Sequence, residues 1–460
     1  MKKKLFYLSF LLCVLSYQSN AQTWTFVGQI GFTPGPAYGS KILVKDDTPY
    51  VAFYGTTYSD PGKYRIQVMF YDGTAWQQYG PNVTNDTTFN HWLLDFKKSA
   101  AGELFIAYID KFAGNKVSVK KFDGNNWVYV GNQGFSPNST ENQFLEMYND
   151  TPYVAIMEYI TNFQKDIIVM KYDGTNWVTV GTNKVATWAN LDGFKIVNGV
   201  PFVSYTNNSH KGLVSYFNGT NWIVINNGPL YYPMNNSYCF QMDYFGDTLY
   251  IPYMVNYLSS SQGNPFFLIR YNVVTQSIDT IHLNKGNINI DNNFERLKLN
   301  NQGEIFFVKY QGPSSNGKRE IIRLDRDNNN TLTIYGGSFP VYRSMENLDL
   351  AFNDNNKPYV VFKDESAYHR LTVCTLGNSS SVGSIYNKSN IYFLYPNPNN
   401  GTFFIQSEKP AIFELTDITG KLINTYRTQG TALQVNENLP AGLYFICEKE
   451  SGITQKIIIQ

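Results

Sequence analysis

The chain has 460 residues, with 37 Lys and Arg against 36 Asp and Glu, and it is only 16% charged but 16% aromatic. This composition excludes a coiled coil and a charged disordered chain. The missing basic excess argues against nucleic acid as the main ligand. Many aromatic and β-branched residues, with frequent Gly, Asn and Asp, favour an all-β protein.

The N-terminus has the three parts of an export signal. The basic start Met1–Lys4 precedes an apolar run from Leu5 to Tyr17, which is too short to span a bilayer. Ser19 and Ala21 then supply small residues for cleavage. The pattern predicts a secretory signal peptide over residues 1–21, because a buried first helix would explain neither the lysines nor the small residues. No later stretch is apolar for long enough to predict a transmembrane segment.

Few cysteines remain after removal of this signal. Cys239, Cys374 and Cys447 are widely spaced, so they predict no disulfide framework, although two of them could still pair. The chain must therefore be stabilised by a hydrophobic core, which its length permits.

One unit of four short strands recurs seven times between Trp24 and Asn378. Its second strand resembles PYVAFYG (49–55), and the third strand ends in motifs such as YDGTAW (71–76). Units five and six keep the strands but lose the tryptophan motif. The aligned aromatic residues of the second strands, about 50 residues apart, are Tyr50, Phe105, Tyr153, Phe202, Tyr250, Phe306 and Tyr359.

Four antiparallel strands in each of seven units predict a seven-bladed β-propeller over residues 22–378. Unit seven lacks its fourth strand, and the sequence WTFVG at residues 24–28 matches the fourth strand WVYVG of unit two. We therefore expect the N-terminal segment to pair with unit seven, with Val27 beside Val373. This pairing would close the ring of blades and cover an edge strand.

The composition changes after Gly377, where a Ser-rich stretch predicts a flexible linker at residues 379–390. Short strands of alternating apolar and polar residues follow, and they contain four short motifs. They comprise Tyr395, Pro396, Asn397 and Pro398 with Gly401, then Gly420, then Gly442 with Tyr444, and finally Lys456 in the closing strand.

Residues 391–460 resemble the type A C-terminal sorting domain of the type IX secretion system of Bacteroidetes. The resemblance implies a small Ig-like β-sandwich, export across the outer membrane by the type IX secretion machinery, and a protein that is secreted or held at the cell surface. An ordinary carbohydrate-binding or Ig-like module is the alternative for this segment.

The Asp-Gly-x-x-Trp motifs resemble the Asp-box of sialidases, but Asp72 and Gly73 are adjacent where an Asp-box has a residue between them. We interpret these motifs as tight turns followed by tryptophans that pack between blades. Sialidase chemistry also needs an arginine cluster for the substrate carboxylate, and the inner strands show none.

No metal or cofactor site is predicted. The segment from Asp325 to Asn329 has the Asp-x-Asp-x-Asn spacing of calcium loops but lacks the later Gly and acidic ligand. The four histidines are scattered, and no phosphate-binding glycine loop is present.

Acidic residues of the predicted inner strands leave an enzyme possible. Two carboxylates at a suitable distance would suit glycoside hydrolysis, although solvated or ion-paired acids are more common. The candidates are Glu146, Asp192, Asp243, Glu295 and Asp349.

Binding is the function that the sequence favours. In a propeller, the connections from strand two to three and from strand four to the next blade lie on one face, and here they are rich in aromatic residues. We expect this face to bind a glycan or a protein; a polysaccharide hydrolase or lyase is the alternative. The ligand-binding candidates are His91, Trp92, Trp188, Tyr231, Tyr232, Tyr257, Tyr342 and Tyr368.

Overall fold

The fold is seen in a computed structural model of the chain. The residues that it describes are 23–57, 60–85, 93–225, 236–256, 266–283, 294–310, 319–326, 329–337, 339, 345–377, 392–395, 397, 399–407, 409–450 and 454–459. The predicted signal peptide and linker lie outside them.

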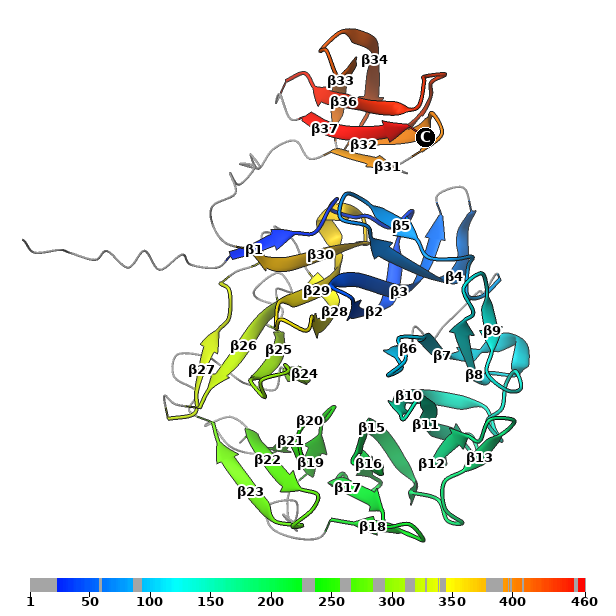
Figure 1. Cartoon of the computed structure of the whole chain (residues 1–460), viewed down its shortest axis with the longest axis vertical. Helices are drawn as coiled ribbons and strands as arrows, with labels where there is room; N and C mark the ends of the chain where they lie inside the picture. The colour runs from blue at the N-terminus through cyan, green and yellow to red at the C-terminus, as the bar shows by residue number, and fades with distance from the viewer. Residues whose placement is uncertain are drawn as a thin grey trace, which may run out of the picture.

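Seven sheets of antiparallel strands surround a common centre within the described residues, and we call each sheet a blade (Figure 1). Blade 1 contains β2 (Ala37–Lys45), β3 (Thr48–Thr57), β4 (Asp60–Tyr71) and β5 (Trp76–Gln78). Blade 2 contains β6 (Leu94–Lys98), β7 (Leu104–Asp110), β8 (Lys116–Phe122) and β9 (Trp127–Tyr129). Blade 3 contains β10 (Thr140–Tyr148), β11 (Thr151–Tyr159), β12 (Lys165–Tyr172), β13 (Trp177–Thr179) and the short β14 (Ala186–Thr187). Blade 4 contains β15 (Ala189–Val197), β16 (Val200–Asn207), β17 (Gly212–Phe217) and β18 (Trp222–Val224).

The remaining blades follow the same order. Blade 5 contains β19 (Asn236–Cys239), β20 (Asp243–Phe245), β21 (Thr248–Asn256), β22 (Phe266–Asn272) and β23 (Ile278–His282). Blade 6 contains β24 (Phe294–Leu299), β25 (Ile305–Tyr310), β26 (Arg319–Asp325) and β27 (Thr331–Ile334). Blade 7 contains β28 (Met345–Phe352), β29 (Pro358–Asp364), β30 (Arg370–Gly377) and β1 (Thr23–Phe26).

The second strand of each blade is a nearly continuous apolar run because neighbouring blades cover both of its faces. Every residue of β7 and of β29 is buried. Core clusters accordingly cross from blade to blade, as where Val51 of blade 1 packs with Val361 of blade 7.

The N-terminal strand completes blade 7, as the sequence predicts. β1 pairs antiparallel with β30, with Thr23 opposite Gly377 and Phe26 opposite Cys374. The backbone N–H of Val27 donates to the carbonyl of Val373 at 2.8 Å. The prediction that this segment supplies the missing fourth strand is confirmed.

Several tryptophans of the fourth strands bond to the blade before them. Trp76 Nε1 donates to the Val27 carbonyl at 2.8 Å, and Trp177 Nε1 donates to the Val130 carbonyl at 2.7 Å. Trp24, only 3% exposed, makes the same kind of bond to Tyr335 of blade 6, at 3.2 Å. β1 is therefore bound between its neighbours by the contacts that the other outer strands use.

The turns before these tryptophans owe their shape to the Asp-Gly pair. Asp72 Oδ1 accepts the backbone N–H groups of Thr74 and Ala75 at 2.7 and 2.8 Å. Gly73 has a φ of 96°, which a side chain would strain. The structural interpretation of the Asp-Gly-x-x-Trp motifs is confirmed.

The inner strand of blade 5 differs from the others because it is divided into β19 and β20. Both parts pair with β21, and residues 240–242 form an irregular stretch opposite Ile251 and Pro252. Pro252 has no N–H to donate to a partner strand, so the ladder is interrupted there.

Residues 392–459 form a separate two-sheet sandwich. One sheet has the order β31-β32-β35 and the other β34-β33-β36-β37. Their bounds are β31 (Tyr392–Tyr395), β32 (Thr402–Ser407), β33 (Pro410–Asp417), β34 (Leu422–Gln429), β35 (Ala432–Asn436), β36 (Gly442–Glu448) and β37 (Thr454–Ile459). Its core includes Phe403, Phe413 and Ile446, all fully buried.

The three cysteines of the described chain are free. Cys239 and Cys374 are buried, and burial raises the pKa of both thiols. Cys447 lies in β36 of the sandwich, half-buried.

Candidate functional site: a loop face above a ring of charges

The connections between strands two and three meet the connections between blades at one end of the sheets. The N–H of Ala37, which opens β2, donates to the His369 carbonyl of blade 7 at 2.9 Å. Thr140 makes the same contact with Asn115 of blade 2, at 2.8 Å. We call this end the loop face. The turns between strands one and two lie at the opposite end, because strand direction alternates within a blade.

Large apolar side chains stand exposed on the loop face of blades 2 to 4. Phe112, in the short 3-10 turn Lys111–Ala113, is 69% exposed, and Phe163, between β11 and β12, is 85% exposed. Trp188, between β14 and β15, is 46% exposed. Exposed aromatic side chains that converge on one face are a common mark of a binding surface.

Trp188 is held in an unusual backbone conformation. Its φ is 51°, a left-handed value that costs a bulky residue about 1–2 kcal/mol. Its N–H donates to Asp166 Oδ1 at 3.1 Å, which fixes that conformation. A strained, exposed tryptophan is a feature that function often explains.

A polar group of side chains surrounds Trp188. Asp166 Oδ2 accepts Lys184 Nζ at 2.7 Å, and Gln164 Nε2 donates to Asp166 Oδ1 at 3.0 Å. Burial alone would raise the pKa of the Asp166 carboxyl, but these hydrogen bonds lower it. The backbone of Trp188 is therefore bonded to an ionised carboxylate that also binds an ammonium and an amide, and groups of all three kinds can bond to hydroxyl groups.

The innermost strands carry charges that alternate around the centre. Their labels surround the middle of the ring in Figure 1. Five charged residues lie opposite the aligned aromatic residues of the second strands. In blade order they are Lys97, Glu146, Lys195, Asp243 and Lys298.

Ion pairs cross from blade to blade along this arc. Lys97 Nζ and Lys195 Nζ each lie 2.9 Å from Glu146 Oε1, and Lys195 Nζ lies 3.2 Å from Asp243 Oδ1. Burial would raise the pKa of Glu146, but the two lysines lower it to about 2. The carboxylates raise the pKa of Lys195, although burial opposes them.

A second arc of alternating charge lies two residues nearer the loop face. It runs from blade 6 through blades 7 and 1 to blade 2 and consists of Arg296, Asp349, Lys41 and Asp95. The two arcs together are called the inner charged ring.

Asp349 is the centre of this second arc. Its Oδ1 lies 2.5 Å from Arg296 Nη1, and its Oδ2 accepts the Ile42 N–H at 3.0 Å. Against the effect of burial, Arg296, Lys41 and Lys298 hold the pKa of Asp349 well below its usual range.

The acidic candidates for catalysis are mostly bound in these ion pairs. Glu146 and Asp243 share Lys195, and Asp349 is paired with Arg296. These three carboxylates are therefore ion-pair partners, which is the more common role expected of such acids from the sequence. The side chain of Glu295 lies outside the described part of the structure. Asp192 is different, since its Oδ2 accepts only the Thr206 hydroxyl, at 2.7 Å, among the hydrogen bonds of described residues.

Asp192 occupies the bulge of β15, where the register with β16 shifts between Leu191 and Gly193. Bulges redirect side chains and are frequent beside functional sites. Burial raises the pKa of Asp192 to about 7, although the Thr206 hydroxyl lowers it. This carboxyl is the acid of the set whose pKa is suited to proton transfer near neutral pH.

The structure describes only two of the predicted ligand-binding residues, Trp188 and Tyr368. Tyr368 caps the turn Glu365–Ala367 with a φ of 56° and packs beside Ile30 and Phe404. The others lie outside the described residues: His91, Trp92, Tyr231, Tyr232, Tyr257 and Tyr342.

Sequence reasoning missed Phe112, Phe163 and the cationic set around Asp349. That set contains a single arginine, Arg296, together with Lys298 of the same strand and Lys41 of β2, so it is not the arginine cluster that sialidase chemistry needs. The sequence does indicate exposure of Phe112 and Phe163, since each lies in a short polar connection between apolar strands two and three.

The sandwich displays its motif residues at turns and strand ends. Asn397 Nδ2 donates to the Lys456 carbonyl, and Asn397 Oδ1 accepts the Ile458 N–H, both at 2.8 Å. Gly401 has a φ of 93°, and a side chain there would collide with the Glu437 carbonyl. Tyr444 Oη donates to the Pro440 carbonyl at 2.8 Å, while Gly420 occupies a turn after Asp417. Pro396 and Pro398 lie outside the described residues.

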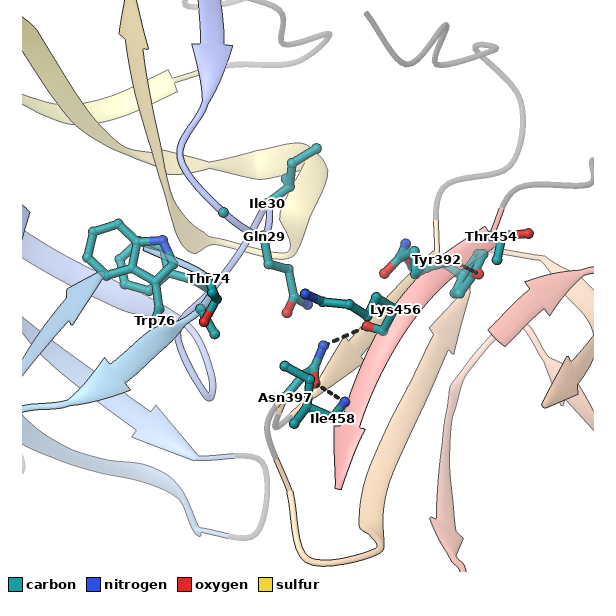
Figure 2. A pocket seen from close by; sticks show the side chains of 13 residues that line it. Gln29, Ile30, Thr74, Trp76, Tyr392, Asn397, Thr454, Lys456 and Ile458 are labelled. Atoms are coloured by element: carbon teal, nitrogen blue, oxygen red, sulfur yellow. Dashed lines mark hydrogen bonds between the residues drawn. The ribbon is translucent and has the colours of Figure 1, made fainter. Parts of the chain in front are cut away.

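Figure 2 shows a pocket of about 310 Å³ between this sandwich and blade 1. Asn397, with its bonds to Lys456 and Ile458, forms one side, and Thr74 and Trp76 form the other. Gln29 reaches across, and its Nε2 donates to the Leu394 carbonyl at 2.6 Å.

Residues 393–460 match the family model of the secretion system C-terminal sorting domain. The sandwich is a type IX sorting domain. The protein that carries this sorting domain is therefore exported by the type IX secretion system, to the cell surface or beyond. No curated protein matches the chain. Within the described residues, no helix is long and apolar enough to cross a membrane.

Solved structures similar to the chain share little sequence with it. A mutant Aleuria aurantia lectin in complex with Fucalpha1-6GlcNAc has 13% identity and a TM-score of 0.40, covering 67% of this chain and 98% of the lectin. An ulvan lyase of polysaccharide lyase family PL25 has 11% identity and a TM-score of 0.46, covering 78% and 96%. A protein of unknown function from Dyadobacter fermentans has 10% identity and a TM-score of 0.38, covering 65% and 96%.

Proposed function

We propose that this is a glycan-binding protein of the cell surface or the extracellular space, built on a seven-bladed β-propeller that β1 closes. In this proposal a signal peptide (1–21) is removed on export. The propeller (22–378), a linker (379–390) and the sorting domain (391–460) follow. The loop face of the propeller binds the glycan.

The exposed aromatic side chains of the loop face carry this proposal. Phe112, Phe163 and Trp188 come from connections of three blades, and the strained backbone of Trp188 is held by Asp166. An exposed indole whose backbone is bonded to Asp166, with an ammonium and an amide on the same carboxylate, suits a sugar, which has an apolar face and hydroxyl edges.

Binding to a glycan array, followed by titration of the best ligand, tests the proposal. Trp188→Ala and Phe163→Ala should each weaken binding about tenfold, or about 1.4 kcal/mol. Phe245→Ala is the matched control, since Phe245 is 43% exposed and ends β20, at the opposite end of the blades from the loop face.

Equal binding by all three variants would reject the loop face as the glycan site. If the propeller bound an exported protein and no glycan, the ligand of the loop face would be a protein. All variants should unfold near the wild-type temperature, because exposed side chains contribute little to stability.

Asp192 is the observation that favours an enzyme as a second candidate. Its pKa of about 7 would let it give or accept a proton at neutral pH. Release of reducing ends from acidic and neutral polysaccharides would detect such an activity. A real activity should disappear in Asp192→Asn, and an activity that persists would not involve this carboxyl.

Truncation tests the domain boundaries and the role of the sorting domain together. Without residues 391–460 the propeller should fold but remain in the periplasm. Replacement of residues 379–390 by a Gly-Ser segment of equal length should leave export intact. Surface delivery of the truncated chain would contradict the assigned role.

A further inference from the structure

Three cations from two strands surround a single carboxylate of the inner charged ring. Arg296 contacts Asp349 directly, and Lys41 and Lys298 interact with it electrostatically. Arg296 and Lys298 come from β24, and Lys41 comes from β2 on the other side of β28. Among the described side chains of this sector that belong to the inner charged ring, three cations therefore lie around one carboxylate.

The cations elsewhere in the ring are neutralised, but two in this sector are not. Lys97 and Lys195 lie in ion pairs with Glu146 and Asp243. Within the described part of the chain, the side-chain ammonium groups of Lys41 and Lys298 form no ion pair or hydrogen bond. Both are only partly accessible to solvent, and an ammonium in such a place is costly without a counterion.

We propose that Lys41, Arg296 and Lys298 form an anion-binding site that receives a carboxylate or sulfate group of an acidic glycan. This inference rests on the proposed function and deepens it, because it names the chemical class of the ligand. Arg296 supplies a planar donor suited to carboxylate and sulfate oxygens, and the two lysines supply compact charges.

The position of the cluster suits a ligand that enters from the loop face. Lys41 follows the register shift of β2 between Tyr38 and Lys41, and Arg296 follows the shift of β24 between Phe294 and Arg296. These irregular stretches lie at the loop-face ends of the inner strands. A glycan bound on the loop face could thus extend an anionic group to the cluster.

The lowered pKa values of Lys41 and Lys298 agree with an excess of positive charge around them. Burial and the nearby Arg296 lower the pKa of Lys41 to about 8, although Asp349 opposes them. Burial is also the main cause that lowers the pKa of Lys298. A bound anion would favour the charged form of both lysines.

The first experiment tests the cluster without assuming a glycan. Sodium glucuronate and sodium sulfate are titrated into the purified protein at constant ionic strength, with chloride as the reference anion, and binding is followed by calorimetry and by the melting temperature. Lys298→Gln and Lys41→Gln should weaken binding of these anions about fivefold to tenfold. Lys97→Gln is the matched control, because Lys97 is already in an ion pair with Glu146.

The second experiment compares hexagalacturonate, its methyl ester and a sulfated oligosaccharide of the same length. Wild-type protein should prefer the charged sugars by about tenfold, and Lys298→Gln should lose that preference without loss of melting temperature. A preference shared by both charged sugars would assign the site to anions in general, and one restricted to hexagalacturonate would assign it to uronates.

The two experiments separate the inference from the proposed function. Absence of anion binding in the first, or equal loss in Lys97→Gln, would overturn the anion site even if a neutral glycan binds. Anion binding that Lys298→Gln weakens, without binding of any glycan, would keep the site and reject the glycan-binding function.

Discussion

The outer edge and the centre of the blades repeat in different ways. At the outer edge the same residue recurs, since Trp24, Trp76 and Trp177 each donate to a carbonyl of the preceding blade. At the centre the position recurs but the residue changes, from Lys97 to Glu146 to Lys195. The same contact can recur wherever a blade keeps this tryptophan, whereas charges attract only where neighbours differ in sign.

An odd number of blades adds a further constraint. On the proposed seven-bladed ring, strict alternation of charge cannot close, so like charges must adjoin somewhere. The ring uses two arcs that overlap at β24, and that strand carries both Arg296 and Lys298. The excess of positive charge therefore lies where the alternation fails, and this sector is the proposed anion site.

The largest effect is expected from removing the shared cation of the first arc. Lys195→Met leaves Glu146 and Asp243 without their common partner and should destabilise the protein by about 3–5 kcal/mol. Urea unfolding would measure the change. The variant that also carries Asp243→Asn should recover most of the loss, because Glu146 keeps Lys97 and no carboxylate of the arc is left without a cation. Failure to recover would show that packing of the Lys195 stem dominates.

A smaller effect with an opposite sign is expected from Asp192. Its pKa is raised from 3.8 to about 7, so its contribution to stability is complete below about pH 4 and lost as the pH rises through 7. Asp192→Asn should therefore be more stable than wild type at pH 8, by about 2 kcal/mol after allowance for solvent near the group. The difference should vanish at pH 4. A constant difference at both values would contradict the raised pKa.

Much of the fold could be predicted from the sequence because the blades repeat in register. The Asp-Gly turns, the apolar second strands and the closing segment at Trp24 all recur with recognisable residue types. The sorting domain was equally readable, since its turns require particular residues such as Gly401. In each case the residues that predict the structure lie within one short segment of the chain.

The site was harder to predict because its contacts join residues far apart in the chain. Asp349 accepts the N–H of Ile42, and Arg296 reaches Asp349 from another blade. Only the packing of blade 7 against blades 6 and 1 brings these residues together. The exposure of Phe163 likewise depends on the length of its connection and on what surrounds it, which its own short segment does not specify.

The outer edge offers a matched pair of tryptophans for the next prediction. Trp76 Nε1 donates to the Val27 carbonyl, whereas the buried Trp127 Nε1 has no hydrogen-bond partner among the described residues. Trp76→Phe should therefore cost about 1.5 kcal/mol more than Trp127→Phe. Urea unfolding of the two variants measures the difference. Equal costs would mean that packing alone, and not this hydrogen bond, joins blade 1 to β1.

The smallest effect concerns the charge state of Lys41 in the proposed anion site. Its pKa of about 8 lies well below the ordinary value of 10.5, mainly because the side chain is buried. Arg296 and Lys298 also disfavour its charge, while Asp349 and Asp95 favour it. Affinity for glucuronate should thus fall about threefold between pH 7 and pH 9.5, roughly 0.6 kcal/mol. Lys41→Arg keeps its charge over this range and should lose less affinity. Parallel pH profiles for wild type and Lys41→Arg would show that Lys41 does not contact the anion, and would restrict the site to Arg296 and Lys298.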